Sequence, residues 1–190
     1  MNLSARYADI SKKESTMPTN VEIEKKYVIA KPDISQLCMI PGYTYSEIEQ
    51  IYLASPSGIT HRIRSRRFPS GVKYTETVKV RIDKMSANET EREITQERYS
   101  ELRENIAPES VPVIKERHTF PYGGHTFEID VYPNWEKSCI MEVELSSRDE
   151  DAILPPFISV IAEVTGDKRY SNASMSRRFP EELTCDISSR

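Results

Sequence analysis

From residue 21 onward, apolar and polar residues alternate with a period of two in several separate segments. Successive side chains of a β-strand point to opposite faces of a sheet, so this alternation predicts strands with one apolar face and one polar face. The clearest segments are residues 21–29, 60–66, 72–82 and 141–145. Their repetition along the chain predicts a mainly β fold of the α+β class, built on an antiparallel sheet.

Helix and turn signals are few. Thr95 has the side chain of an N-cap, and apolar residues follow it at helical spacing, which predicts an outer helix over residues 95–103. Pro155-Pro156 precedes an apolar run and predicts a second helix through residue 161, because proline is tolerated in the first turn. A last short helix is expected over residues 171–178, and Gly123-Gly124 predicts a hairpin turn.

The polar faces of the predicted strands carry charges that are segregated by sign. Acidic side chains share a face at Glu22 and Glu24, at Glu89, Glu91 and Glu93, at Glu128 and Asp130, and at Glu142 and Glu144; basic ones do so at Arg62 and Arg64, at Lys79 and Arg81, and at Lys115 and Arg117. Like charges at positions i and i+2 repel, so such a sheet needs opposite charges on neighbouring strands, metal ions or a polyanion. The alternative is an ordinary solvated face, which antiparallel sheets often have. The segregation by sign favours a binding site.

Length and composition narrow the choice of function. The chain has 190 residues, about one domain, and its 26 Lys and Arg against 30 Asp and Glu give a net charge of −4. This balance excludes a general attraction to nucleic acid or anionic lipid. Residues 1–20 lack any period and are interpreted as a flexible leader, residues 21–183 as the folded domain, and residues 184–190 as a tail.

The cysteines and the apolar runs indicate a compartment. Cys38, Cys139 and Cys185 are widely spaced, and no pair has the spacing of a zinc or redox site. No stretch approaches the ~18 apolar residues needed to span a bilayer, and the N-terminus has no secretory signal. We therefore expect a cytoplasmic protein with no membrane partner.

A polar face of this kind suits phosphoryl transfer from a polyphosphate chain. Basic side chains neutralise phosphate oxygens, while clustered carboxylates hold hard divalent cations such as Mg²⁺ or Mn²⁺. The strand faces hold roughly seven acids and six bases, which a triphosphate of charge about −4 to −5 and two divalent cations would leave close to neutral. A barrel of about eight strands is just wide enough inside for one small ligand.

Several motifs resemble those of one protein family. Glu22-Ile23-Glu24-Lys25-Lys26 resembles the ExExK signature near the start of CYTH-domain proteins, also called triphosphate tunnel metalloenzymes. Later segments resemble the family's RxR, TxK, ExE, KxR, xxDV and closing ExE motifs, in that order: Arg62-Ile63-Arg64, Thr77-Val78-Lys79, Glu91-Arg92-Glu93, Lys115-Glu116-Arg117, Glu128-Ile129-Asp130-Val131 and Glu142-Val143-Glu144. Residues 163–172 resemble the EVTxDxRYxN ending of the bacterial branch, so the resemblance covers about residues 21–178.

The resemblance implies an eight-stranded antiparallel β-barrel that forms a tunnel, with helices around it. It implies that the triphosphate is held by basic side chains, namely Lys26, Arg62, Arg64, Lys79, Lys115, Arg117 and Lys168. It implies metal ligands among the acidic side chains, namely Glu22, Glu24, Glu142 and Glu144, with Glu91, Glu93 and Asp130 as further ligands or as partners of the bases. Two Mg²⁺ or Mn²⁺ ions are expected, one of them activating water.

Glu24, Lys79 and Tyr52 are the residues to which the resemblance gives catalytic roles. Gln50-Ile51-Tyr52-Leu53 resembles the family's QGYL, whose tyrosine assists proton transfer in some members, although Ile51 here replaces the glycine. A tyrosine in a strand is also commonly a packing residue, and this alternative stays open for Tyr52.

Two departures from the family pattern bear on activity. Class IV adenylate cyclases of this fold carry His-Phe shortly before ExExK, whereas this chain has Thr16-Met17-Pro18-Thr19-Asn20. Many members have arginine two residues before the first ExE, where this chain has Glu89, which puts the metal occupancy of that strand in doubt. The expected activity is hydrolysis of inorganic triphosphate to pyrophosphate and phosphate. Adenylate cyclase, thiamine or nucleoside triphosphatase, and a non-catalytic polyphosphate binder are the alternatives, and a homodimer is left open.

Overall fold

The computed structural model describes residues 20–81 and 86–184, and the side chains of residues 20–22, 81 and 86–88 lie outside that description. The predicted leader, apart from residue 20, and the predicted tail, apart from residue 184, also lie outside it. In the described ranges, strands dominate and helices are short. The strands are β1 (Asn20–Ala30), β2 (Thr44–Tyr52), β3 (Ile59–Phe68), β4 (Gly71–Arg81), β5 (Ser86–Ile94), β6 (Val113–Tyr122), β7 (His125–Val131), β8 (Ser138–Glu144) and β9 (Val160–Glu163).

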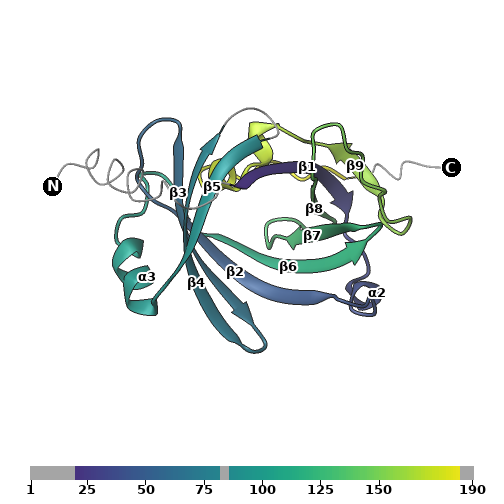
Figure 1. Cartoon of the computed structure of the whole chain (residues 1–190), viewed down its shortest axis with the longest axis horizontal. Helices are drawn as coiled ribbons and strands as arrows, with labels where there is room; N and C mark the ends of the chain where they lie inside the picture. The colour runs from purple at the N-terminus through teal and green to yellow at the C-terminus, as the bar shows by residue number, and fades with distance from the viewer. Residues whose placement is uncertain (1–19, 82–85, 185–190) are drawn as a thin grey trace.

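The nine strands of the described chain form one antiparallel sheet that curls round on itself. Its order is β5-β4-β3-β2-β6-β7-β8-β1-β9, and β1 also pairs with β5 from Asn20↔Glu89 to Ile23↔Ser86. That additional pairing joins the first eight strands in a ring, although over four residue pairs only (Figure 1). The predicted eight-stranded antiparallel barrel is confirmed as the fold, with this short closure and the added strand β9 as refinements.

The described residues include four short helical segments: α2 (Ile34–Leu37), α3 (Gln96–Arg103), the 3₁₀ helix η1 (Lys168–Tyr170) and α4 (Asn172–Met175). Helix α3 begins as predicted, because the Thr95 side chain accepts a hydrogen bond from the backbone N–H of Arg98. Tyr99 and Leu102 of α3 pack with Ile51 and Ile63 on the outer face of β2 and β3. Helix α3 therefore covers apolar residues on the outside of the sheet.

The predicted helix over residues 155–161 is wrong. The chain makes a turn in which the N–H of Ile158 donates to the carbonyl of Pro155, and then enters β9, which pairs with β1 at Tyr27, Val28 and Ile29. The exposed edge of β1 beyond its short pairing with β5 offers unpaired backbone groups, and satisfying them favours a strand over a helix.

The predicted hairpin between β6 and β7 is confirmed. Tyr122 pairs with His125 across a two-residue turn made by Gly123 and Gly124, whose φ values are +58° and +86°. Two consecutive positive φ values are the geometry of the tight turns that suit twisted strands, and glycine adopts them without a steric penalty.

The inside of the barrel changes from charged to apolar along its length. On β1 the inward positions run from Glu24 and Lys26 to Val28, and on β8 they run back from Glu144 and Glu142 to Ile140. Val28 and Ile140 belong to a buried cluster whose other members include Tyr132, Trp135, Tyr170 and Met175. This cluster, the apolar floor, fills one end of the interior beside η1 and α4.

Candidate active site

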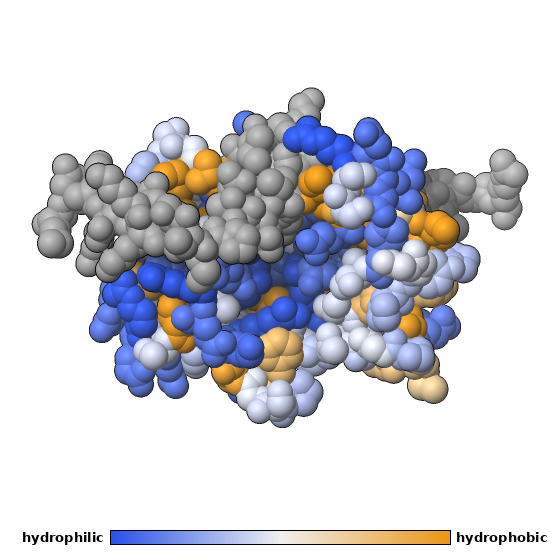
Figure 2. Space-filling model, in the orientation of Figure 1, coloured by the Kyte–Doolittle hydropathy of each residue, from blue (hydrophilic) through white to orange (hydrophobic). Residues whose placement is uncertain are grey.

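A cavity of about 570 Å³ lies inside the barrel, next to the apolar floor. Eight strands, β1 to β8, and the start of α4 line it. On the face of the molecule that Figure 2 shows, hydrophilic residues gather around the middle. Of the described residues that line it, six are basic and six are acidic: Lys26, Arg62, Arg64, Arg66, Lys79 and Arg117, and Glu24, Glu89, Glu91, Glu128, Glu142 and Glu144. The lining therefore contains both charges, and basic and acidic side chains are concentrated on different sides of the cavity.

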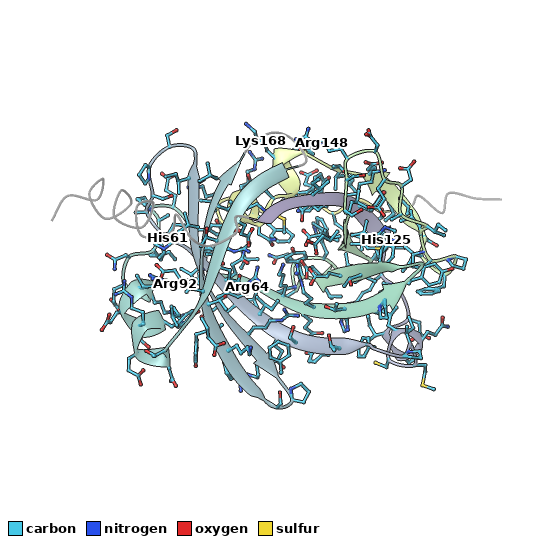
Figure 3. All side chains as sticks on the ribbon, viewed as in Figure 1. His61, Arg64, Arg92, His125, Arg148 and Lys168 are labelled. Atoms are coloured by element: carbon cyan, nitrogen blue, oxygen red, sulfur yellow. The ribbon has the colours of Figure 1, made fainter. Side chains whose placement is uncertain are left out.

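The basic side of the cavity comes chiefly from β3. Arg62, Arg64 and Arg66 occupy alternate positions and so point to the same face, while His61 and Ile63 are buried on the opposite face. Figure 3 shows Arg64 directed toward the space that the sheet encloses. Three guanidinium groups are thus brought to one wall by the period of a single strand.

Arg64 is a buried cation whose strongest hydrogen bonds go to a neutral group. Its Nε and Nη2 donate to Oε1 of Gln50 at 3.2 and 3.0 Å. Among the described residues the carboxylate recorded within ion-pair distance is that of Glu91, with Oε2 4.0 Å from Nη1. Burial, followed by repulsion from Arg62 and Arg117, lowers the pKa of Arg64 to about 10. An anion placed beside Arg64 would relieve this repulsion.

The acidic side comes from β1, β7 and β8, where two pairs of carboxylates face each other across strands. Glu24 lies directly opposite Glu144, and Glu128 directly opposite Glu142. Lys26 lies among them, with Nζ 2.7 Å from Glu142 and 3.6 Å from Glu24. Burial opposes the charge of Glu142, but Lys26 and Arg117 outweigh it and hold the pKa of Glu142 well below its usual range. Glu142 is therefore ionised at neutral pH.

Beneath the cavity lies a buried ion cluster of Lys115, Arg117 and Asp130. Asp130 and Lys115 are fully buried, and Asp130 accepts from Lys115 Nζ and, at 2.6 Å each, from Nε and Nη2 of Arg117. Burial, followed by repulsion from Arg117, lowers the pKa of Lys115 to about 8. Asp130 therefore fixes the guanidinium of Arg117, which reaches the cavity and also donates to Glu142 at 3.0 Å.

Tyr52 lies between the cavity and the apolar floor. Its ring packs in the buried cluster, and its side chain also lines the cavity. Its hydroxyl oxygen accepts a 2.6 Å hydrogen bond from Nε2 of Gln50. Burial raises the pKa of Tyr52 against the lowering effect of Arg62, Arg64 and Lys26, so the hydroxyl keeps its proton at neutral pH. Both interpretations of Tyr52, as packing residue and as site residue, describe part of its surroundings.

Comparison with known proteins identifies a related enzyme. An inorganic triphosphatase from Nitrosomonas europaea is 32% identical to the chain over 164 residues, which make up 84% of this chain and 99% of that protein. The chain belongs to the triphosphate tunnel metalloenzyme (CYTH) family. The family predicted from the motifs is confirmed.

Solved structures agree with this triphosphate tunnel fold. The crystal structure of an inorganic triphosphatase matches with a TM-score of 0.55 and 28% identity, over 84% of this chain and 97% of that one. The structure of a Pyrococcus horikoshii protein matches in fold with a TM-score of 0.53 and 24% identity, over 67% of this chain and 80% of that one. No protein-family model matches the chain.

The structure brings most of the predicted triphosphate tunnel residues together. The predicted residues that line the cavity are Glu24, Lys26, Tyr52, Arg62, Arg64, Lys79, Glu91, Arg117, Glu142 and Glu144. Lys115 and Asp130 lie beneath them, in the buried ion cluster. Glu93 is exposed, 3.6 Å from Lys73, and Lys168 is exposed at the edge of the molecule (Figure 3). Glu22 pairs with Ala87 through its backbone, and its side chain lies outside the description.

Some cavity residues were not assigned a role from the sequence. Arg66 continues the alternation of Arg62 and Arg64, and Glu128 shares the face of Asp130, so the period could have placed both. Gln50 belongs to the motif that resembles QGYL, and no role for it follows from the sequence. In the structure it is fully buried and makes hydrogen bonds with both Arg64 and Tyr52. Ser171 to Ala173, at the start of α4, line the cavity through tertiary packing that no local pattern reveals.

The acidic residues of this site suit a hard divalent cation in their chemistry. Like charges directly opposite each other on neighbouring strands are destabilising unless a cation lies between them, and Glu24 and Glu144 are placed in this way. Among the described residues, no three Asp, Glu, His or Cys side chains gather into a ready cation cage. Mg²⁺ is commonly held by one or two carboxylates together with substrate phosphates, so a pair of carboxylates in an anion-binding cavity fits it.

Proposed function

We propose that the protein hydrolyses inorganic triphosphate to pyrophosphate and phosphate inside this cavity, with Mg²⁺ or Mn²⁺ as cofactor. The observation that carries the proposal is one cavity with three arginines of β3 on one wall and the opposed carboxylates Glu24 and Glu144 on another. Arginines suit phosphate oxygens and carboxylates suit hard cations, so a polyphosphate with its cation matches both walls.

Membership of the family sets the class of enzyme. A chain that matches an inorganic triphosphatase along 99% of that protein's length is a hydrolase acting on phosphoanhydride bonds. The identity of the substrate as inorganic triphosphate and the need for a metal are the finer parts of the proposal.

The residues divide the work of holding the substrate. Arg62, Arg64 and Lys79 bind the non-bridging oxygens along one side, and Arg117, fixed by Asp130, neutralises charge from the other. Water adds to the terminal phosphorus, the bridging P–O bond breaks with its electron pair going to pyrophosphate, and the proton of the water is released to solvent. Tyr52, which keeps its proton, donates a hydrogen bond to an oxygen of the leaving group.

Glu24 and Glu144 would hold the cation, and Glu142 and Glu91 also line the cavity. When bound, the cation supplies Lewis-acid stabilisation of the charge on the phosphoryl oxygens. Lys26, between Glu142 and Glu24, keeps these carboxylates from repelling each other and so preserves the acidic wall before the cation arrives.

A substrate panel tests the proposal. Phosphate release is measured from inorganic triphosphate, ATP, thiamine triphosphate and pyrophosphate, with Mg²⁺, Mn²⁺ or EDTA. We expect fastest release from inorganic triphosphate with a divalent cation, and a loss of at least about 100-fold in Glu24→Ala. Glu101→Ala, which removes an exposed carboxylate of α3 that pairs with Arg98, is the matched control.

The panel also separates inorganic triphosphatase from the other triphosphatases and from a non-catalytic binder. Faster release from an organic triphosphate would replace the substrate but keep the reaction, and binding of triphosphate without release under every metal condition would reduce the protein to a binder. Full activity in Glu24→Ala or in EDTA would remove the cation from the proposal.

Among the described residues, no helix is long and apolar enough to cross a lipid bilayer. The cytoplasmic location and the homodimer stay predictions.

A further inference from the structure

Glu89 is a carboxylate placed on the basic side of the cavity. It lies on β5 directly opposite Lys79 of β4, and Nζ of Lys79 is 3.2 Å from its Oε2. Nη2 of Arg62, on the next strand, donates to its Oε1 at 2.7 Å. One acidic side chain therefore contacts two of the cationic side chains that the proposed function assigns to phosphate.

These contacts lie in a poorly solvated part of the site. The side chains of Arg62, Lys79 and Glu89 are 14%, 18% and 15% exposed. The hydrogen bond from Arg62 and the ion pair with Lys79 are stronger in such surroundings than exposed ones, because little water screens them. A phosphate that enters the cavity must therefore share or replace these contacts of Glu89 with Arg62 and Lys79.

The two oxygens of Glu89 face Nη2 of Arg62 and Nζ of Lys79, which are both groups that bind phosphoryl oxygens. A carboxylate and a phosphate present similar oxygen atoms to a guanidinium and an ammonium group. Glu91, two residues along on the same face, is held differently, by a 2.9 Å hydrogen bond from the hydroxyl of Thr77, and its oxygen lies 4.0 Å from Arg64. Glu89 is thus the carboxylate of β5 that contacts Arg62 and Lys79.

We propose that Glu89 sets the affinity of the cavity for polyphosphate by competing with the substrate for Arg62 and Lys79. The inference rests on the proposed function in taking triphosphate as the anion. While the cavity is empty, Glu89 neutralises these two cations, and when triphosphate enters, its oxygens displace the carboxylate or bind beside it. Glu89 thereby weakens the hold of the cavity on free polyphosphate and on the pyrophosphate product.

A purely structural role predicts the opposite result. If Glu89 served to orient Arg62 and Lys79 for phosphate, its removal would let both side chains wander and would weaken binding. Competition predicts tighter binding as soon as the negative charge is removed, even when the shape of the side chain is kept. Glu89→Gln separates these roles, because an amide oxygen can still accept from Arg62 but carries no charge.

The test is calorimetric titration of tripolyphosphate into wild type, Glu89→Gln and Glu89→Ala in EDTA, where no turnover disturbs the equilibrium. We expect Glu89→Gln to bind roughly 5- to 30-fold more tightly than wild type, the fold-change that corresponds to one charge-assisted interaction. Glu101→Gln, which removes the same charge from an exposed ion pair of α3, should bind as wild type does. Pyrophosphate should show the same order.

Each outcome decides the matter. Equal or weaker binding by Glu89→Gln overturns the competition, and a gain in Glu101→Gln of the same size shows that net charge alone is responsible. A wild type that binds nothing while Glu89→Gln binds supports the inference, and two proteins that bind nothing overturn it. Phosphate release from wild type is measured separately, so hydrolysis with unchanged binding in Glu89→Gln removes this inference and leaves the proposed function standing.

Discussion

The side-chain amide of Gln50 donates a hydrogen bond of 2.6 Å to the hydroxyl oxygen of Tyr52. The direction follows from the other end of the amide, because two nitrogens of Arg64 donate to its oxygen and leave the NH₂ group facing Tyr52. Tyr52 is thus an acceptor toward Gln50, and its own proton is turned elsewhere. One buried residue therefore orients both a cation and a proton donor of the cavity.

Replacing Gln50 by Glu should separate stability from binding. The new carboxylate keeps the shape of the glutamine side chain. It pairs with Arg64 and accepts a hydrogen bond from the hydroxyl of Tyr52, so it occupies both groups that the substrate needs. We expect an unchanged or higher melting temperature and about a 10-fold or greater loss of tripolyphosphate affinity, which is about 1.4 kcal/mol. Thermal melting and calorimetric titration of the same preparation measure the two effects. Retained affinity would mean that Arg64 and Tyr52 do not contact the substrate.

Tyr52→Phe removes the hydroxyl but keeps the ring in the apolar floor. If the hydroxyl assists the leaving group, kcat should fall roughly 10- to 100-fold with little change in KM. Tyr99→Phe is the matched control, since it deletes another buried tyrosine hydroxyl, one that donates to Glu49 at 2.8 Å away from the cavity. An unaltered kcat in Tyr52→Phe would leave the residue with packing alone.

Arg64→Met should lose function and gain stability. Burial and the neighbouring Arg62 and Arg117 disfavour the charge of Arg64, as its lowered pKa records, so a long apolar side chain relieves the folded state. We expect kcat/KM to fall by at least about 100-fold and the melting temperature to rise by about 2–4 °C, the shift produced by 1 kcal/mol in a domain of this size. A melting temperature that falls by the same amount would show that the hydrogen bonds to Gln50 outweigh the repulsion.

Glu76, which lies outside the cavity, should make the stability of the fold depend on pH. Burial alone would raise its pKa, but hydrogen bonds from His61 at 2.8 Å and from Arg92 at 2.6 and 2.9 Å lower the pKa of Glu76 to about 2. The stability that this contributes is fully present above the unfolded-state pKa of about 4.3 and is lost as the pH falls toward 2. Glu76→Gln should therefore be roughly 1–3 kcal/mol less stable at pH 7.

The difference between wild type and Glu76→Gln should shrink as the pH is lowered. Urea unfolding at pH 7, 5 and 3 measures it, with Glu101→Gln as an exposed carboxylate control. A difference that stays constant from pH 7 to pH 3 would assign the loss to the shape of the side chain, because the charge would then play no part.

Periodicity predicted the faces of the strands well, because a β-strand repeats every two residues. Arg62, Arg64, Glu142 and Glu144 line the cavity that their alternation and motifs indicated. Periodicity does not give the position of a residue along the barrel axis. Glu93 shares the face of Glu91 but lies beyond the cavity, beside Lys73, and residues of this kind are separated only by the register between strands.

Pairing between distant charges could not be predicted either. Lys115 and Arg117 share one face of β6, two positions apart. Lys115 is buried against Asp130, whereas Arg117 pairs with Asp130 and also reaches the cavity, and this difference depends on how β7 pairs with β6. The wrong helix at residues 155–161 has a similar cause. The apolar run is compatible with helix or strand, and the open edge of β1, distant in sequence, decides for β9.

The apolar floor has a consequence for the length of chain that the enzyme can use. Tyr132, Trp135 and Tyr170 fill the interior beneath the buried ion cluster, so within the described residues a long polyphosphate has no path to thread past them. We therefore expect only its last phosphates to enter the cavity, with the remainder of the chain in water at the opening. Such an enzyme would act on the ends of its substrates, and each product would leave through the opening by which the substrate entered.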